Sequence, residues 1–451
     1  MNGWGGPHRI GHFNPSQAGD LLRSVLTRLH RSRFVRNVLV VASGTAGAQV
    51  ITMAFAPLIT RLYGPEAFGL LGTFLAVLAI VLPVAALTYP IAIVLPKNDQ
   101  EAHALARLCA VLASGLSLLV LLLLFVFGDK LLYSVGLEPL SEFMWFIPLA
   151  MFFAAGQQIL EQLLIRRKAF KSIARVAVAQ SLTLNAAKTG FGLWHPAGAT
   201  LIVLATAGHA LHACFLWLGV RRNVGVERLG GPAGGADRAN IWQLAGRYRD
   251  FPMFRAPQVM INALSQGLPV LMLASFSGPA AAGFYSLGKT VLGAPVLLIS
   301  KSVGDVFYPK IAEAAQRQES VWPLLWKATL ALGGVGFAPF ALVVAFGPWL
   351  FGVVFGSEWV TAGEYARWLA LWLYFGFLNR PSVVAIQTLG MQGFFLVYEI
   401  VSVGLRVTAL FLGFWVYESD LLAVVFFSLT GVFLNCLLIG LTMYKSIRLA
   451  K

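Results

Sequence analysis

The sequence predicts an all-α polytopic membrane protein with twelve transmembrane helices in two six-helix bundles and with both termini in the cytoplasm. Of its 451 residues, 58% are apolar and only 12% are charged, whereas roughly a quarter of the residues of a soluble protein are charged. The apolar residues occur in runs of the roughly 20 residues that a helix needs to cross a bilayer. One turn motif also recurs half a chain length later, which indicates two copies of one unit.

The first 37 residues are a basic segment that precedes the first long apolar run. Asp20 is a candidate N-cap for a short helix with leucines on one face and arginines on the other. We expect this amphipathic helix to lie on the membrane surface. The segment shows no secretory signal peptide.

Twelve apolar runs follow and are predicted to be the transmembrane helices. They begin near Val38, Leu70, Leu105, Phe143, Ser172, Ala199, Phe254, Ala281, Leu324, Tyr365, Phe394 and Leu421. The predicted domains are a first bundle at residues 38–220, a cytoplasmic linker at residues 221–250 and a second bundle at residues 251–451.

Basic residues gather in alternate loops. The predicted cytoplasmic loops hold basic groups within residues 166–175, 221–249 and 310–327, whereas the outside loops hold little more than Arg61 and Lys130. This asymmetry places both termini in the cytoplasm. It also accounts for the excess of 34 Lys and Arg over 19 Asp and Glu better than a nucleic-acid partner does, because the cations are spread over short loops.

The predicted linker is rich in glycine between Gly230 and Gly235, which favours a flexible connection over a packed domain. A phosphate-binding loop is disfavoured there, because no strand precedes the glycines and no Gly-Lys-Ser or Gly-Lys-Thr ends them.

The repeated motif is Gly64-Pro65-x-Ala67-x-Gly69, which returns as Gly278-Pro279-x-Ala281-x-Gly283 after 278 − 64 = 214 positions. With six helices in each copy, both copies enter the membrane from the same side, so that their symmetry axis runs along the membrane normal. We therefore expect a cavity between the two halves. Prolines also occur in matching helices, and we expect them to interrupt the first, second, seventh and eighth helices. These are Pro57, Pro83, Pro90, Pro257, Pro269 and Pro295.

The stretches Leu58 to Gly69 (LITRLYGPEAFG) and Phe251 to Lys310 resemble the polysaccharide transporter family, the Wzx-like oligosaccharide flippases of the multidrug/oligosaccharidyl-lipid/polysaccharide superfamily. The resemblance runs from about Arg36 to the carboxyl terminus. It implies a MATE-like V of two six-helix bundles. It also implies that an oligosaccharide linked to undecaprenyl pyrophosphate is moved between the leaflets of the bacterial cytoplasmic (inner) membrane, with a polysaccharide polymerase as a candidate partner.

Six cations fall inside or at the margins of the predicted helices, where an unpaired cation is costly and usually faces the bundle interior or water. They are Lys188, Arg255, Lys289, Lys301, Arg380 and Arg406. We expect them to bind the head group of an anionic lipid, because guanidinium groups match phosphate oxygens two at a time. Arg255, Lys289 and Arg380 are the stronger candidates. Those nearer the helix ends can instead reach the interface or pair with a neighbour.

Three further charged residues have alternative roles. Arg61 ends the first predicted helix, where it can contact the head group or, as we favour, anchor the outer turn through backbone carbonyls. Glu399 is a candidate site for a coupling proton or sodium ion, although pairing with a cation of another helix is favoured. Asp305 is a second candidate for ion coupling, but it follows Lys301 by four residues, which allows the local ion pair that we favour.

The remaining polar residues indicate neither an enzyme nor a metal site. The three cysteines each lie inside an apolar run, and the seven histidines share no ligand spacing with a carboxylate. No catalytic motif and no cofactor motif occurs. Amides at membrane depth, such as Asn262 and Gln266, can bind sugar hydroxyls or join helices, and joining helices is the commoner use.

Two other functions compete with a flippase. A cation-coupled multidrug exporter of the same fold would be expected to bind its cationic drugs with buried carboxylates, which the first, second, seventh and ninth predicted helices lack. A membrane-bound glycosyltransferase or polymerase would need a large outside loop or an acidic cluster, and the outside loops are short.

Overall fold

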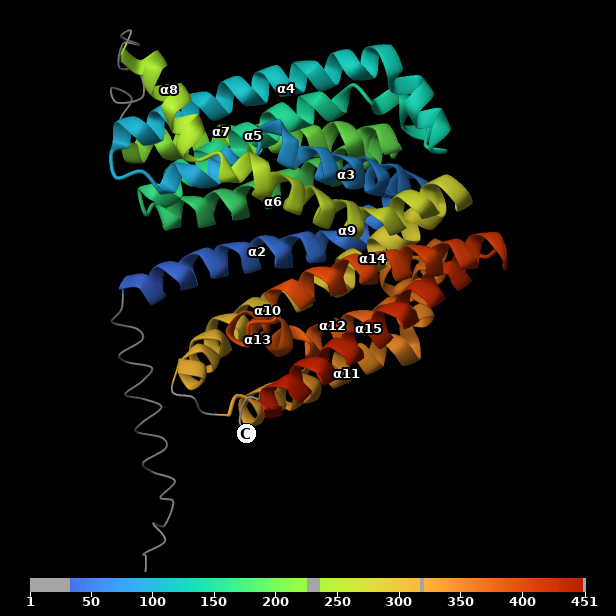
Figure 1. The fold of residues 1–451 in the computed structure, drawn as a ribbon. Helices are drawn as coiled ribbons and strands as arrows, with labels where there is room; N and C mark the ends of the chain where they lie inside the picture. The colour runs from blue at the N-terminus through green and yellow to red at the C-terminus, as the bar shows by residue number, and fades with distance from the viewer. Residues whose placement is uncertain (1–32, 225–235, 317–319, 449–451) are drawn as a thin grey trace, which may run out of the picture.

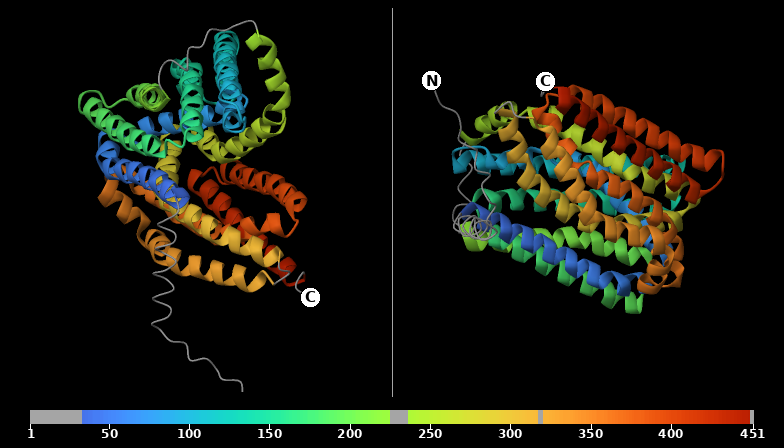
Figure 2. Two further views of the ribbon diagram at one scale, coloured as in Figure 1. Left: turned by 90° about the vertical axis from the view of Figure 1, so that its left-hand side faces the viewer. Right: turned by 90° about the horizontal axis from the view of Figure 1, so that it is seen from below.

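The computed structural model describes residues 33–224, 236–316 and 320–448, and these residues are almost entirely helical, with no strand among them. The amphipathic helix predicted after Asp20 lies outside the described residues. The chain is drawn in Figure 1, and Figure 2 gives two further views.

The helices before the linker match the first six predicted apolar runs. They are α2 (Arg33–Leu62), α3 (Pro65–Ala85), the short 3-10 helix η1 (Tyr89–Val94), α4 (Asp99–Ser134), the 3-10 helix η2 (Glu138–Phe143), α5 (Phe146–Arg166), α6 (Phe170–Trp194) and α7 (Gly198–Val224).

After α7 come a helix in the linker, α8 (Ala236–Arg247), and a π-helical turn, η4 (Phe251–Arg255). The helices that follow match the remaining six predicted apolar runs. They are α9 (Ala256–Ser277), α10 (Pro279–Gln316), α11 (Trp322–Phe355), the 3-10 turn η5 (Ser357–Trp359), α12 (Val360–Leu378), α13 (Arg380–Thr388), α14 (Gln392–Trp415) and α15 (Asp420–Arg448).

Within the described residues, eight helices are long and apolar enough to cross a membrane, or nine if the bent pair of α12 and α13 is one span. The count of twelve crossings stays a prediction. Large apolar side chains that face outward, such as Phe125 at 74% and Leu122 at 54% exposure on α4, are expected of a surface that contacts lipid rather than water.

The helices form two groups that run along the same direction. In Figure 1, α4 to α7 make the upper part and α10 to α15 the lower part, with α2 and α9 between them. We call the end of the molecule at which α2 begins, α8 lies and α15 ends the linker end. The opposite end, which holds the turns at Gly64 and Gly278, is called the turn end.

The two copies of the repeated motif pack against each other at the turn end. A Cβ atom on Gly69 would overlap the carbonyl oxygen of Pro279, and a Cβ atom on Gly283 would overlap the carbonyl oxygen of Pro65. Pro65 and Pro279 are equivalent in the two copies, as are Gly69 and Gly283, because each pair is 214 positions apart. The last glycine of each motif therefore packs against the proline of the other motif. We call this reciprocal contact between α3 and α10 the glycine seam.

Part of the predicted linker is helical and packed. In α8, Leu244 is only 1% exposed, and the backbone oxygen of Ala245 accepts a hydrogen bond of 3.0 Å from the hydroxyl of Tyr89 in η1. Arg247 also forms an ion pair of 3.3 Å with Glu101 of α4. The sequence reasoning missed this helix because glycines dominate the segment before it, and residues 225–235 lie outside the described part of the chain.

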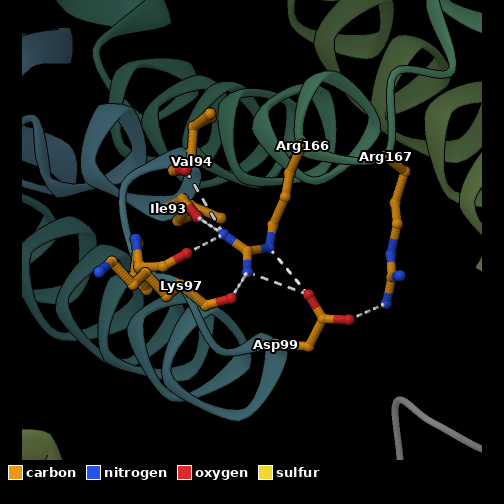
Figure 3. A network of polar contacts seen from close by, with 7 residues as sticks. Ile93, Val94, Lys97, Asp99, Arg166 and Arg167 are labelled. Atoms are coloured by element: carbon orange, nitrogen blue, oxygen red, sulfur yellow. Dashed lines mark hydrogen bonds and ion pairs between the residues drawn. The ribbon is translucent and has the colours of Figure 1, made fainter.

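A network around Arg166 joins the end of α5 to the segment between η1 and α4 (Figure 3). The Arg166 side chain donates to the backbone oxygens of Ile93, Val94, Pro96 and Lys97, the shortest being the bond of 2.6 Å to Pro96. It also pairs with Asp99 at 3.0 Å, and Arg167 pairs with the other carboxylate oxygen at 2.8 Å. The last carbonyls of a short helix such as η1 have no hydrogen-bond partner within the helix. Arg166 donates hydrogen bonds to these carbonyls and to those of the residues that follow η1.

The predicted interruptions occur in only two of the four helices. The second run breaks after α3, where Leu87 and Thr88 have positive φ angles of 50° and 57°, and the seventh begins with the π-helical turn η4. The first and eighth runs form the continuous helices α2 and α10, so the prediction for them was wrong. Proline is tolerated within membrane helices because small local adjustments and neighbouring groups satisfy the freed carbonyls.

Candidate functional site

A cavity of about 690 Å³ lies among α9, α10, α12, α13, α14 and α15, and we call it the cationic cavity. Its lining includes four of the candidate residues from the sequence: Lys289, Arg380, Glu399 and Arg406. Among its described lining residues, Gln49 of α2 alone comes from before the linker. The cavity is therefore built almost wholly by the second half of the chain.

Lys289 reaches the cavity from α10. Its Nζ atom donates a hydrogen bond of 2.8 Å to the backbone oxygen of Gln266 in α9, and it lies 6.0 Å from the ring centroid of Tyr285. Tyr285 is fully buried. The ammonium group is thus held at the junction of α9 and α10, and only one of its three donors is used by a hydrogen bond within the described residues.

One face of α14 supplies both Glu399 and Arg406. These residues and Ser402 are separated by three, four and seven positions, the spacings that share a helix face. The Nε atom of Arg406 donates to the backbone oxygen of Ser402 at 3.1 Å. No ion pair joins Arg406 to Glu399 within the described part of the chain, yet Arg406 is near enough to act electrostatically on both Glu399 and Lys289.

Arg380 lies where α12 meets α13, a break at which the two helices are bent by 43°. The preceding residue, Asn379, is 4% exposed and donates through Nδ2 to Oδ1 of Asn435 in α15 at 2.9 Å. Asn435 in turn donates to the backbone oxygen of Gly431 at 2.8 Å. These bonds fix the bend, while the exposed Arg380 side chain makes no hydrogen bond to any described residue and faces the cavity.

The described lining residues supply three cationic side chains and one carboxylate, together with the amides of Gln49, Asn262, Gln266, Asn379 and Asn435. Such a set is suited to an anion with several oxygens, because cations and amide donors can each bind one or more of them. The described residues contain no cluster of three His, Cys, Asp or Glu side chains that could hold a metal ion.

Three of the predicted cations lie elsewhere. Arg255 is exposed in η4 and donates to Gln258 at 3.1 Å. Lys188 is half-buried on α6, where its backbone oxygen accepts a bond of 2.9 Å from Tyr63. Arg61 donates to the backbone oxygen of Val353 in α11 at 2.7 Å, which is the anchoring role favoured from the sequence. The backbone of Lys301 and Asp305 lies in α10, but their side chains are outside the described part of the structure.

Several lining residues were not among the predicted site residues, including Gln49, Tyr398 and Ser402. The spacing of Glu399, Ser402 and Arg406 could have identified Ser402, and the four-residue spacing of Asn262 and Gln266 could have placed both amides on one face. Gln49 carried no comparable signal, because its position depends on the packing of α2 against the second half.

Comparison with known proteins gives one family match and several similar proteins. The family described as "Polysaccharide biosynthesis protein" matches residues 58–364. The succinoglycan biosynthesis transport protein ExoT of Rhizobium meliloti (strain 1021) is 22% identical over 344 residues, which cover 73% of this chain and 63% of that protein. This chain therefore spans less than two thirds of the length of that relative.

Two solved structures share the fold at low sequence identity. An inward-facing multidrug resistance MATE family transporter of the MOP superfamily has a TM-score of 0.69 at 15% identity, over 89% of this chain and 95% of that one. The lipid II flippase MurJ in an inward closed conformation has a TM-score of 0.66 at 10% identity, over 91% of this chain and 90% of that one. The MATE-like arrangement predicted from the sequence is thereby confirmed.

Proposed function

Because the chain belongs to the polysaccharide biosynthesis protein family, we propose that it is a flippase for an oligosaccharide linked to a polyprenyl pyrophosphate. The chain is a multi-pass membrane protein, and its family and its similar proteins are transporters and flippases rather than enzymes. The proposed reaction is the transfer of the sugar-bearing head group from the cytoplasmic to the periplasmic leaflet, for the synthesis of a cell-surface polysaccharide.

The observation that supports this substrate most is the charge of the cationic cavity. Among the described lining residues, Lys289, Arg380 and Arg406 share one space with a single carboxylate, Glu399. A pyrophosphate that enters a hydrocarbon layer loses its water and needs counter-charge, which these side chains supply. The volume of about 690 Å³ is within the usual range for a small-molecule site, roughly 300 to 1,000 Å³. It suits the pyrophosphate and the nearest sugar, while the polyprenyl tail remains in lipid.

The path and the surroundings form part of the same proposal. The linker end faces the cytoplasm of a bacterial cell, and the head group enters the cavity from that side. The two halves then rock so that the cavity opens at the turn end. A polysaccharide polymerase is the proposed partner that takes over the product outside the inner membrane.

A cation-coupled multidrug exporter is not favoured by the cavity. A cationic drug would be repelled by an excess of two positive charges over negative ones among the described lining residues, since three cations face one carboxylate. An exported organic cation with no effect on surface polysaccharide would reverse this choice.

The proposal is tested by neutralising the cavity cations one at a time. Lys289→Gln, Arg380→Gln and Arg406→Gln should each lower the rate of flipping of a fluorescent lipid-linked oligosaccharide in proteoliposomes by roughly 10- to 100-fold, the loss expected for one charge-assisted hydrogen bond. The triple variant should be inactive.

Arg255→Gln is the matched control, because Arg255 is exposed and, among the described residues, its side chain bonds only to Gln258 at the start of α9. Its flipping rate should stay near that of the unchanged protein. A triple variant that is folded and flips at the full rate would remove the cavity from the proposed function. Equal losses in Arg255→Gln and the cavity variants would show a general effect of surface charge instead.

A further inference from the structure

At the turn end, the two halves contact each other through residues at equivalent positions of the internal repeat. Besides the pairing of Gly69 with Pro279 and of Gly283 with Pro65, the next turn of each helix repeats the arrangement. A Cβ atom on Gly72 would lie 3.0 Å from Cβ of Ser286, and 72 + 214 = 286. Small residues thus allow α3 and α10 to approach along two successive turns.

Contacts from α2 and η5 cover the side of this seam. The indole of Trp359 is 1% exposed and donates from Nε1 to the backbone oxygen of Thr60 at 3.0 Å. Its ring meets Phe68 of α3 edge-on at 5.1 Å and Phe284 of α10 at 6.1 Å. Trp359 therefore touches both halves beside the glycine seam, and Arg61 adds its bond to Val353 nearby.

A second cavity of about 610 Å³ lies at the turn end and is lined by Pro65 of the seam and by Phe284, the residue after Gly283. It is lined by the carboxylates of Glu66 and Glu358 and shares no lining residue with the cationic cavity. Within the described residues, the two spaces are thus separate and opposite in charge, and the seam forms a wall of the one at the turn end.

We propose that the glycine seam is the seal that closes the cationic cavity toward the turn end, and that the two copies of the motif open and close it as one reciprocal unit. Its contacts are between backbones and small residues, so that the helices can separate without withdrawing interlocked side chains. The symmetry adds a specific expectation, which is that a methyl group at position 69 and one at position 283 have the same effect.

The closed seam can be trapped by a disulfide between Gly72→Cys and Ser286→Cys, in a protein whose three native cysteines are replaced. The Cβ separation of 3.0 Å needs a small relaxation to reach the usual value of about 3.8 Å. The pair should cross-link in native membranes without any substrate, so this readout does not depend on the proposed function. Thr52→Cys with Ser181→Cys is the matched control, because their hydroxyl oxygens lie 3.0 Å apart within the first half.

The seal is then weakened by Gly69→Ala and, separately, by Gly283→Ala. Each should lower the yield of the seam disulfide by roughly tenfold and to a similar extent, because the added methyl group disfavours the closed state. The control pair should cross-link fully in both. Gly115→Ala, at a helical glycine where an added Cβ would meet nothing within 4 Å beyond its own stretch of helix backbone, should leave both yields unchanged.

If an alanine variant does not fold, Trp359→Phe is a second way to weaken the seal. It removes the hydrogen bond from Nε1 to Thr60 but keeps an aromatic ring. It should lower the seam yield less than the alanine variants do. The proposal is overturned if the seam pair cross-links as fully in the folded Gly69→Ala and Gly283→Ala proteins as in the parent. It is also overturned if only one of the two glycines matters, or if the cross-linked protein flips lipid at the rate of its reduced form.

Discussion

Glu399 is the carboxylate that shares the cationic cavity with Lys289, Arg380 and Arg406. Its negative charge offsets part of the attraction that the cations exert on an anionic head group. Glu399→Gln should therefore tighten the binding of a short-chain polyprenyl-pyrophosphate sugar by roughly tenfold, an effect of the size expected for one charge at several ångströms in a partly polar site. Quenching of tryptophan fluorescence can report the binding, because Trp372 lines the same cavity.

Glu364→Gln is the control for this prediction, because Glu364 pairs with Arg367 at 3.8 Å and does not line the cavity. Its affinity should not change. Weaker binding by Glu399→Gln would mean that the carboxylate holds the cations in place or carries a coupling ion, as the sequence left open.

At the scale of single residues, the sequence identified membrane-depth charge but not the direction in which each charge points. Lys289, Arg380 and Arg406 are cations within or beside apolar runs, as Arg255 and Lys188 are. Of these five, the first three alone line the cavity. The difference depends on the rotation of each helix about its axis and on the end at which a residue lies. Both are set by packing between helices, which a single sequence does not contain.

The junction around Arg166 shows how one side chain stabilises a whole element. Arg166 donates to four backbone oxygens around η1 and pairs with Asp99, and its side chain is 12% exposed. Arg166→Gln should lower the free energy of unfolding by about 1.5 to 3 kcal/mol, the cost expected when charged hydrogen bonds to partly buried groups are lost. A lower midpoint of thermal unfolding of the detergent-solubilised protein would confirm this.

The adjacent Arg167 supplies the matched control. It contacts the same carboxylate at 2.8 Å with 29% of its side chain exposed, and its side chain makes no other ion pair and no hydrogen bond to a backbone carbonyl within the described residues. Arg167→Gln should cost less than about 1 kcal/mol, as surface ion pairs do. Equal losses in the two variants would show that the ion pair with Asp99, and not the bonds to the carbonyls, stabilises the junction.

At the scale of elements, helices were more predictable than breaks. Each predicted apolar run overlaps one long helix, because hydrophobic length is a property of the sequence itself. The breaks were less predictable. Pro57 lies inside the continuous helix α2, whereas the break after α3 occurs at Leu87 and Thr88, two residues that rarely adopt positive φ. Thr88 is held there by the bond from its hydroxyl to the backbone oxygen of Phe251, at 3.0 Å, a contact 163 residues away along the chain.

For the molecule as a whole, the basic loops predict that the linker end is cytoplasmic and the turn end periplasmic. In a protein without native cysteines, Ser357→Cys at the turn end should react with a membrane-impermeant maleimide on intact cells. Asn98→Cys at the linker end should react only after the membrane is permeabilised. Both positions are exposed, so that a difference in labelling reports the side of the membrane. The reverse pattern would invert the orientation and, with it, the proposed direction of transport.

The whole-molecule arrangement was predicted from the repeat and not from composition. A six-position motif that recurs with four identical residues after 214 positions indicated two copies, and the copies are found packed against each other at that same motif. What the repeat could not predict is the unequal share in the cavity, because a duplicated backbone does not require duplicated charges. Among the lining residues that the structure describes, Gln49 alone represents the first half.

The reciprocal contact between Gly69 and Pro279 and between Gly283 and Pro65 also bears on how a duplicated chain can diverge. The described lining of the cationic cavity comes almost wholly from the second half, so that a substitution there meets few residues of the first half. At this contact each half is the other's environment, and a bulkier residue in either copy is opposed by the partner copy at once. A duplicated chain can therefore carry a one-sided set of charges in its cavity, while the contact between the two motifs constrains both copies alike.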